Sequence, residues 1–173
     1  MACRLNAIPR EVSMGKATRP VPDGYHTITA QLTIDNAAQA IDWYKRAFGA
    51  TEVGRSLGPD GKIMHAEIRI GDSPIVLNDA MQDMKGPKAL GGSPAALWLY
   101  VDNSDEVFKR ATAAGATVKM PMEDQFWGDR AGALQDPAGY TWWIATHKED
   151  LSRPEIEKRA QDFFKQTANA GPR

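Results

Sequence analysis

The sequence contains the same pattern of elements twice. A segment rich in apolar residues ends at an Asn, a run with helical spacing of apolar residues follows, and a Gly closes the run, first from Asn36 to Gly49 and again from Asn103 to Gly115. Asn is a favoured residue at a helix start, and Gly is a favoured residue just past a helix end. Internal repetition normally indicates supersecondary units that bury their apolar faces against one another. The chain is therefore predicted to form two paired modules.

Each half predicts the order strand, helix, strand, strand, strand. Residues 27–34 alternate between apolar and polar side chains, as in a half-buried strand. Segments rich in Gly, Pro and Asp separate the later strands. In the first half we expect strands at 27–34, 51–56, 63–70 and 75–78 and a helix at 37–48; in the second half we expect strands at 96–101, 117–120, 132–135 and 141–146 and a helix at 105–114.

These elements predict an α+β protein. Two paired βαβββ modules are expected to form a curved mixed sheet around a cleft, with the helices on the outer face. The expected organisation is a disordered leader at 1–24, modules at 25–80 and 95–150, a linker at 81–94, and a C-terminal helix and tail at 151–173.

The composition limits which partners and which cellular compartment we expect for this protein. Lys and Arg number 21 against 22 Asp and Glu, so the net charge of -1 gives no general attraction to nucleic acid or to an anionic membrane. No apolar run approaches the roughly 20 residues needed to span a bilayer. The leader lacks the apolar centre of a secretory signal, and the single cysteine, Cys3, allows no intramolecular disulfide. We therefore expect a cytoplasmic protein.

Several stretches resemble one known family. They include the turn at 136–139 and the segments 63–68, 71–73, 126–132 and 142–152. Together they resemble the vicinal oxygen chelate superfamily, which includes glyoxalase I and the bleomycin-resistance proteins, and within it the PhnB-like branch. The resemblance covers about residues 25–152 and implies a homodimer as well as the fold.

The resemblance also implies where a metal would bind. In the metalloenzymes of this superfamily, four strand positions present His, Gln or Glu to one divalent ion. Matching those positions to this sequence gives Thr29, Ala96, Trp143 and one residue of 75–77. Ala and Trp have no suitable lone pair for a metal. We therefore expect no cofactor and no metal ligand in the usual positions, with a divalent metal at an atypical site, built from His65, Glu67 and His26, as the alternative.

Polar residues of the first module are predicted to line the cleft. His65, Glu67 and Arg69 share one face of their strand, opposite the apolar face. A histidine side chain can gain and lose a proton near neutral pH, so His65 and Glu67 are candidates for acid and base catalysis. A histidine that only makes structural hydrogen bonds explains the same pattern. Thr29 and Gln31 are expected to orient a polar group of a ligand, unless they are simply solvated.

The second module contributes aromatic candidates. Trp98 and Trp143 are expected on the cleft side, where a ring suits a planar ligand. In the segment 126–132, Trp127 and Arg130 are expected to clamp a ligand, with Asp129 beside them. The alternatives are ordinary packing for Trp98 and an ion pair between Asp129 and Arg130.

Two functions follow from these residues. The first is a protein that binds a small organic molecule in the cleft between the modules without the usual metal. The second is an enzyme of the same superfamily, a lyase, isomerase or dioxygenase, that uses His65 and Glu67 or an atypical metal. Neither hypothesis requires a nucleic acid or a membrane as partner.

Overall fold

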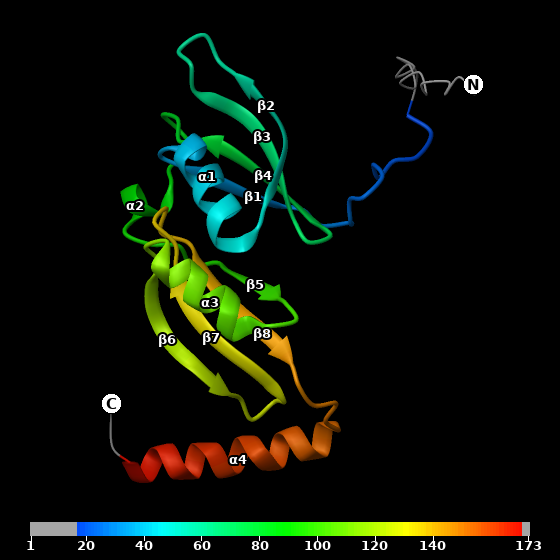
Figure 1. Cartoon of the computed structure of the whole chain (residues 1–173), viewed down its shortest axis with the longest axis vertical. Coiled ribbons are helices and arrows are strands. Elements are labelled where there is room, and N and C mark those ends of the chain that lie inside the picture. Colours follow the sequence, from blue (N-terminus) through cyan, green and yellow to red (C-terminus); the bar gives the residue numbers. More distant parts are fainter. Residues whose placement is uncertain (1–16, 171–173) are drawn as a thin grey trace, which may run out of the picture.

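Two four-stranded mixed sheets form the framework of the computed structural model, which describes residues 17–170 (Figure 1). The strand order is β1-β4-β3-β2 in the first sheet and β5-β8-β7-β6 in the second. In each sheet the first pair is parallel and the other two pairs are antiparallel. The α+β fold with two βαβββ modules is confirmed.

The elements occur in the predicted order, and their bounds differ from the predicted ones by up to four residues in the two modules. The first module comprises β1 (Ala30–Ile34), α1 (Ala37–Phe48), β2 (Thr51–Leu57), β3 (Ile63–Ile70) and β4 (Ser73–Asp79). The second comprises β5 (Ala96–Tyr100), α3 (Ser104–Ala113), β6 (Thr117–Asp124), β7 (Asp129–Gln135) and β8 (Thr141–His147). A short helix that the sequence did not predict, α2 (Pro87–Leu90), lies in the linker, and α4 (Arg153–Ala170) follows the second module.

The repeated helix boundaries have the expected chemistry. The side chain of Asn36 accepts a hydrogen bond from the Gln39 amide, and that of Asn103 accepts one from the Glu106 amide. Gly49 ends α1 with φ of 70°, in the left-handed region that glycine tolerates best. In α3 the cap is Ala114, one residue before the predicted glycine.

The first strand is shorter than predicted. It begins at Ala30, and Ile28 is 87% exposed. β1 pairs in parallel with β4, and Ala30 lies opposite Ile75. The preceding position on β4 is Pro74, which has no amide hydrogen for the ladder. The alternating pattern of residues 27–29 therefore does not extend the strand.

The two modules pack together through their helices. Trp43 Nε1 of α1 donates to the Ala114 carbonyl at 2.9 Å, and Arg110 Nε of α3 donates to the Ala47 carbonyl at 2.8 Å. One buried apolar cluster contains residues of both modules, among them Ile41 and Trp142. Burying a large apolar side chain stabilises a fold by about 1.5–3 kcal/mol. The junction is thus a shared core.

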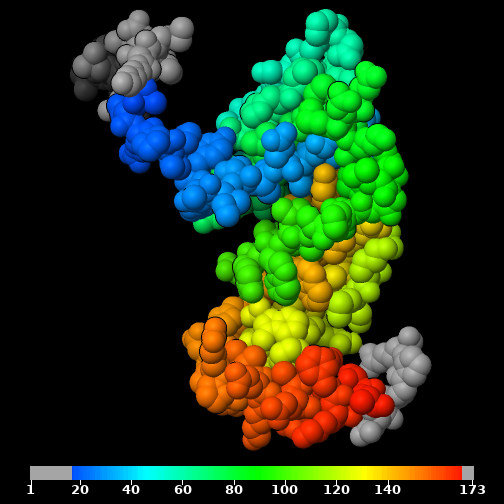
Figure 2. Space-filling view, turned by 180° about the vertical axis from the view of Figure 1, so that it is seen from behind, coloured from blue at the N-terminus to red at the C-terminus, as the bar shows by residue number. Residues whose placement is uncertain are grey.

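Both helices of the modules lie on one side of the sheets (Figure 1). The opposite side, seen from behind in Figure 2, carries the sheet faces that these helices leave uncovered. At the far end of the second module, Phe126 contacts Phe163 and Phe164 of α4, with ring centroids 5.6 and 6.1 Å apart. Among the described residues, no helix has the length and apolar character to cross a membrane.

Candidate functional site

Two tryptophans stack on the uncovered face of the second sheet. Trp98 of β5 lies opposite Trp143 of β8, so the two side chains point to the same side. Their ring centroids are 4.8 Å apart and their planes differ by 3°. Trp98 is nevertheless 46% exposed, so one of its surfaces is free to contact a ligand. The two rings therefore share the sheet face opposite Trp142, which is buried in the core.

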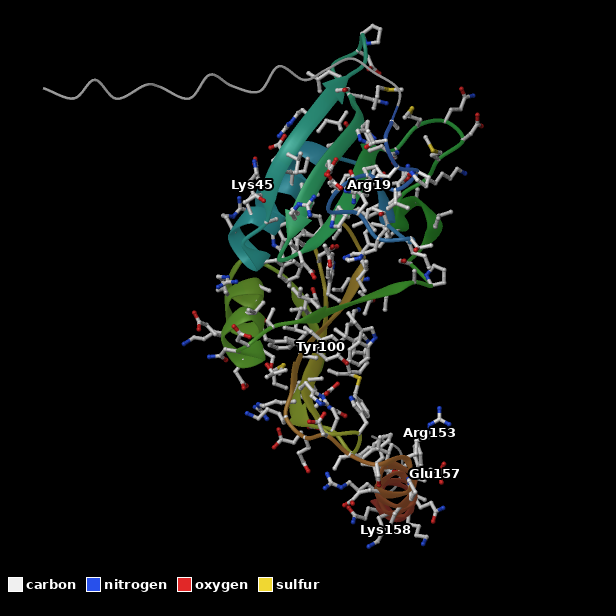
Figure 3. The ribbon with its side chains drawn as sticks, turned by 90° about the vertical axis from the view of Figure 1, so that its right-hand side faces the viewer. Arg19, Lys45, Tyr100, Arg153, Glu157 and Lys158 are labelled. Carbon is white, nitrogen blue, oxygen red and sulfur yellow. The ribbon has the colours of Figure 1, made fainter. Side chains whose placement is uncertain are left out.

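Two more rings extend this surface. The Trp127 ring meets the Trp98 ring edge to face at a centroid distance of 6.3 Å, and Tyr100 lies 6.1 Å from Trp98. Tyr100 projects from β5 on the side away from α3 (Figure 3). We call Trp98, Tyr100, Trp127 and Trp143 the aromatic face.

A buried carboxylate orients the aromatic face. Asp129 is only 3% exposed. Its Oδ2 accepts hydrogen bonds from Trp127 Nε1 and from the Tyr100 hydroxyl, both at 2.9 Å. Its Oδ1 accepts one from His147 Nδ1 at 2.8 Å. Three donors compensate the desolvation of the carboxylate and fix the two rings. Burial and the bond to Asp129 raise the pKa of Tyr100.

Small residues leave room for these rings. Ala131 and Ala133 of β7 lie on the same face as Asp129, and Ala145 of β8 lies opposite Ala131. All three are buried. Larger side chains at these positions would occupy the volume that the tryptophan and tyrosine rings now fill.

His147 is a site residue that the sequence did not predict. It occupies the last position of β8, on the same face as Trp143, and pairs with Asp129 in the sheet register. Its hydrogen bond to Asp129 raises its pKa most, and its hydrogen bond to Asp150 raises the pKa further. The signal was present, because alternate residues of one strand share a face and Trp143 and His147 are four residues apart.

The first module carries a polar face. Gln31 Nε2 donates to Asn78 Oδ1 at 2.9 Å, which fixes the Gln31 side chain. Arg69 Nη1 donates to the Gly24 carbonyl, and Arg69 Nη2 lies 3.9 Å from the Glu67 carboxylate. Thr29 lies just before β1. We call Gln31, His65, Glu67, Arg69 and Asn78 the polar face.

His65 and Glu67 do not form the expected acid and base pair. Both project from β3, but His65 is exposed and, within residues 17–170, has no hydrogen-bond or ion-pair partner. Glu67 instead contacts Tyr25, and the hydrogen bond to Glu67 raises the pKa of the Tyr25 hydroxyl. The ring of His65 therefore lacks the second group that would orient it for proton transfer.

The position of Arg130 contradicts two expectations from the sequence. It follows Asp129 on β7, and adjacent strand residues point to opposite faces. Its guanidinium forms a bidentate ion pair with Asp105 of α3: Nε lies 2.6 Å from Oδ2 and Nη2 lies 2.7 Å from Oδ1. Its Nη1 donates a third hydrogen bond to Asp124. The bond from Arg130 lowers the pKa of Asp105. Arg130 therefore neither clamps a ligand beside Trp127 nor pairs with Asp129.

The usual metal positions of the superfamily do not fit a metal here. Ala96 pairs with Thr141, and Trp143 is engaged in the stack with Trp98. On β4 the residue facing Gln31 is Val76, which has no donor atom. In the part of the chain that the structure describes, no three His, Cys, Asp or Glu side chains gather into a group suited to a metal ion. His26, His65 and Glu67 thus form no alternative cluster.

The predicted residues divide between two open faces. Within residues 17–170, no hydrogen bond joins a side chain of the polar face to one of the aromatic face. A hollow of about 350 Å³ lies at the module junction and is lined by Trp43, Lys88 and Pro137, among others. None of the predicted site residues lines it. The hollow at the junction is therefore not the cleft that the sequence led us to expect between the polar and the aromatic residues.

Comparison with known proteins is consistent with this architecture. The profile of the Glyoxalase/Bleomycin resistance protein/Dioxygenase superfamily matches residues 25–144. An uncharacterized protein of Mycobacterium tuberculosis is 43% identical over 135 residues, covering 75% of this chain and 79% of that protein. Protein YjdN of Escherichia coli is 28% identical and covers 66% of this chain and 90% of its own length.

Solved structures show the same fold. TioX from a Micromonospora species is 26% identical, with a TM-score of 0.56, covering 73% of this chain and 100% of its own. A gene product from Arabidopsis thaliana is 25% identical, with a TM-score of 0.58, covering 72% of this chain and 99% of its own. The PhnB protein from Bacillus cereus is 19% identical, with a TM-score of 0.56 over 70% of this chain and 99% of its own.

Proposed function

Because the chain belongs to the glyoxalase/bleomycin resistance protein/dioxygenase superfamily, we propose that it binds a small planar organic molecule without the metal usual in that superfamily. The stacked and partly exposed pair of Trp98 and Trp143 carries the proposal. An aromatic contact adds about 0.5–1.5 kcal/mol beyond the area that it buries. A further flat ring placed on Trp98 would continue the stack.

Preorganisation supports binding at this face. Asp129 fixes Trp127 and Tyr100 before any ligand arrives. Rotamers that are already ordered need not be immobilised on binding, which removes part of the entropic cost of association. The aromatic face therefore has the rigidity expected of a binding surface.

We further propose that the protein is a homodimer in which a second copy covers the open sheet faces. On the uncovered face of the second sheet, three large side chains are exposed in the single chain: Trp98, Tyr100 and Met120. Soluble monomers rarely expose large contiguous apolar patches. A two-fold arrangement is the commonest oligomer. The arrangement that we propose places the polar face of one copy against the aromatic face of the other.

The proposed dimer supports a second candidate function, that of an enzyme. His65 and Glu67 lie on the polar face, so a facing copy would bring them towards a ligand held on the aromatic face. An enzyme with a proton-transfer step, such as a lyase or an isomerase, is the candidate that this arrangement favours. Membership of the PhnB-like branch and a cytoplasmic location remain part of the proposal, supported by the sequence segments 126–132 and 142–152 and by the single cysteine.

Calorimetric titration with 2-naphthamide, a neutral planar probe, tests the binding proposal. We expect Trp98→Leu to weaken binding about tenfold, because it removes the exposed ring of the stack. Phe164→Leu is the matched control, since Phe164 is an exposed aromatic residue of α4 outside the aromatic face. Equal affinities of the wild type and Trp98→Leu, or a stoichiometric divalent metal whose removal abolishes binding, would contradict the proposal.

A further inference from the structure

His147 lies between two carboxylates at one end of the aromatic face. Its Nδ1 is 2.8 Å from Asp129 Oδ1, and its Nε2 is 3.1 Å from Asp150 Oδ1. Carboxylates accept hydrogen bonds and do not donate them when ionised. Both ring nitrogens must therefore carry a hydrogen to satisfy both contacts, so the arrangement selects the imidazolium form.

The two carboxylates differ in how firmly they are held. Asp129 is buried and accepts three hydrogen bonds, so it is a fixed part of the sheet. The Asp150 side chain is fully exposed, and its contact with His147 is its sole ion pair among the described residues. Exposed ion pairs contribute little stability, so displacing Asp150 from Nε2 costs little.

The position of His147 relates it to the aromatic face. It lies four residues beyond Trp143, which corresponds to about 13 Å along a strand. Trp127 bridges that span, because it contacts the Trp98 ring and shares Asp129 with His147. A planar molecule placed on Trp98 and Trp127 would therefore direct one end towards His147.

We infer that the ligand of the aromatic face carries a carboxylate, and that this group replaces the Asp150 carboxylate on His147 Nε2. The inference rests on the proposed binding of a planar molecule and adds the chemical class of that molecule, a planar aromatic acid. Asp150 is the intramolecular occupant of the position that the ligand carboxylate takes. Asp129 positions His147, and His147 contacts the ligand.

The surrounding charges set the pH dependence. Asp129 of β7 and Asp150 face His147 directly, and the Tyr100 hydroxyl of β5 reaches the same Asp129. Glu149 is paired with Arg159 of α4. Because the two aspartates raise the pKa of His147, the ring stays protonated to a higher pH than an ordinary histidine. The site should therefore prefer a carboxylate ligand over a neutral one below the pKa of His147, and this preference is lost as the pH rises through that pKa.

Calorimetric titration of the full chain with 2-naphthoate and 2-naphthamide tests the inference, since the two probes have the same rings and differ in charge. Near pH 6 we expect naphthoate to bind about tenfold more tightly than naphthamide, with the difference shrinking towards pH 9. Asp150→Asn removes the competing carboxylate and should strengthen naphthoate binding about threefold without changing naphthamide binding. His147→Gln should abolish the preference. Lys109→Gln is the control, because it removes an exposed positive charge from α3, which lies outside both the polar face and the aromatic face.

The outcomes separate the two levels of the proposal. If both probes bind equally at pH 6, or if Asp150→Asn leaves naphthoate affinity unchanged, the carboxylate inference is wrong while binding at the aromatic face stands. If neither probe binds, the proposed function fails and this inference fails with it. Asp150 is fully exposed, so its substitution tests the inference without threatening the fold.

Discussion

The hydroxyl of Tyr44 in the first module donates a 2.7 Å hydrogen bond to the buried carboxylate of Asp136 in the second. Trp142 Nε1 donates to the same oxygen at 2.8 Å, and the Tyr140 amide donates to the other oxygen. Burial raises the pKa of both Asp136 and Tyr44. A turn of one module is thus anchored by a side chain of the other.

Tyr44→Phe should destabilise the protein by about 1–2 kcal/mol, because it removes one donor from a buried carboxylate. Urea unfolding followed by circular dichroism measures this change. Tyr25→Phe is the matched control, since it removes a hydroxyl distant from the junction and should cost less than about 0.5 kcal/mol. Equal losses in the two variants would show that the contact with Asp136 does not stabilise the junction.

Gly132→Ala should destabilise the protein by about 1–3 kcal/mol through overpacking. A Cβ at this position would lie 2.9 Å from the Phe108 ring of α3 and 3.0 Å from the Pro121 carbonyl. Gly54→Ala is the control, because a Cβ at Gly54 of β2 meets nothing within 4 Å. Thermal unfolding of both variants measures the two effects, and a Gly132→Ala protein as stable as the wild type would contradict the close packing of α3 on β7.

Glu52 should make stability depend on acid pH. Hydrogen bonds lower the pKa of Glu52 to about 2, and the bond from Arg55 has a larger effect than the bond from Lys45. Because this pKa is lower in the folded state than in the unfolded chain, the contribution is present above about pH 4.5 and is lost as the pH falls towards 2. Glu52→Gln should cost about 1 kcal/mol at neutral pH, since solvent screens the pair, and nothing near pH 2. Urea unfolding at several pH values measures the difference, and a pH-independent cost would contradict the assignment.

Asp129→Asn should lower the pKa of His147 towards its ordinary value, because the largest cause of the raised pKa is the hydrogen bond to Asp129. A proton NMR titration of the His147 ring measures this pKa directly. Asp150→Asn should lower it less, since the bond to Asp150 is the second cause. A larger effect of Asp150→Asn than of Asp129→Asn would reverse the proposed roles of the two carboxylates.

Local patterns in the sequence predicted much of the architecture. The Asn and Gly residues that flank each helix act on their own backbone neighbours, so their meaning could be recognised without knowing the fold. Strand alternation and the resemblance to the superfamily placed Trp98 and Trp143 on one face, because side-chain direction along a strand has a period of two. Arg130 was expected in a loop before a strand at 132–135, so this rule was not applied to it. Because β7 begins at Asp129, Arg130 is a strand residue and points to the opposite face.

Alternation and capping are properties of neighbouring residues, and the sequence by itself therefore determined the two modules and their element order. Only the tertiary structure decided that Asp129 joins Tyr100, Trp127 and His147, and that Tyr44 anchors Asp136. These relationships depend on strand register and on how one module packs against the other. Residues far apart in the chain meet there, and no local period encodes which of them do.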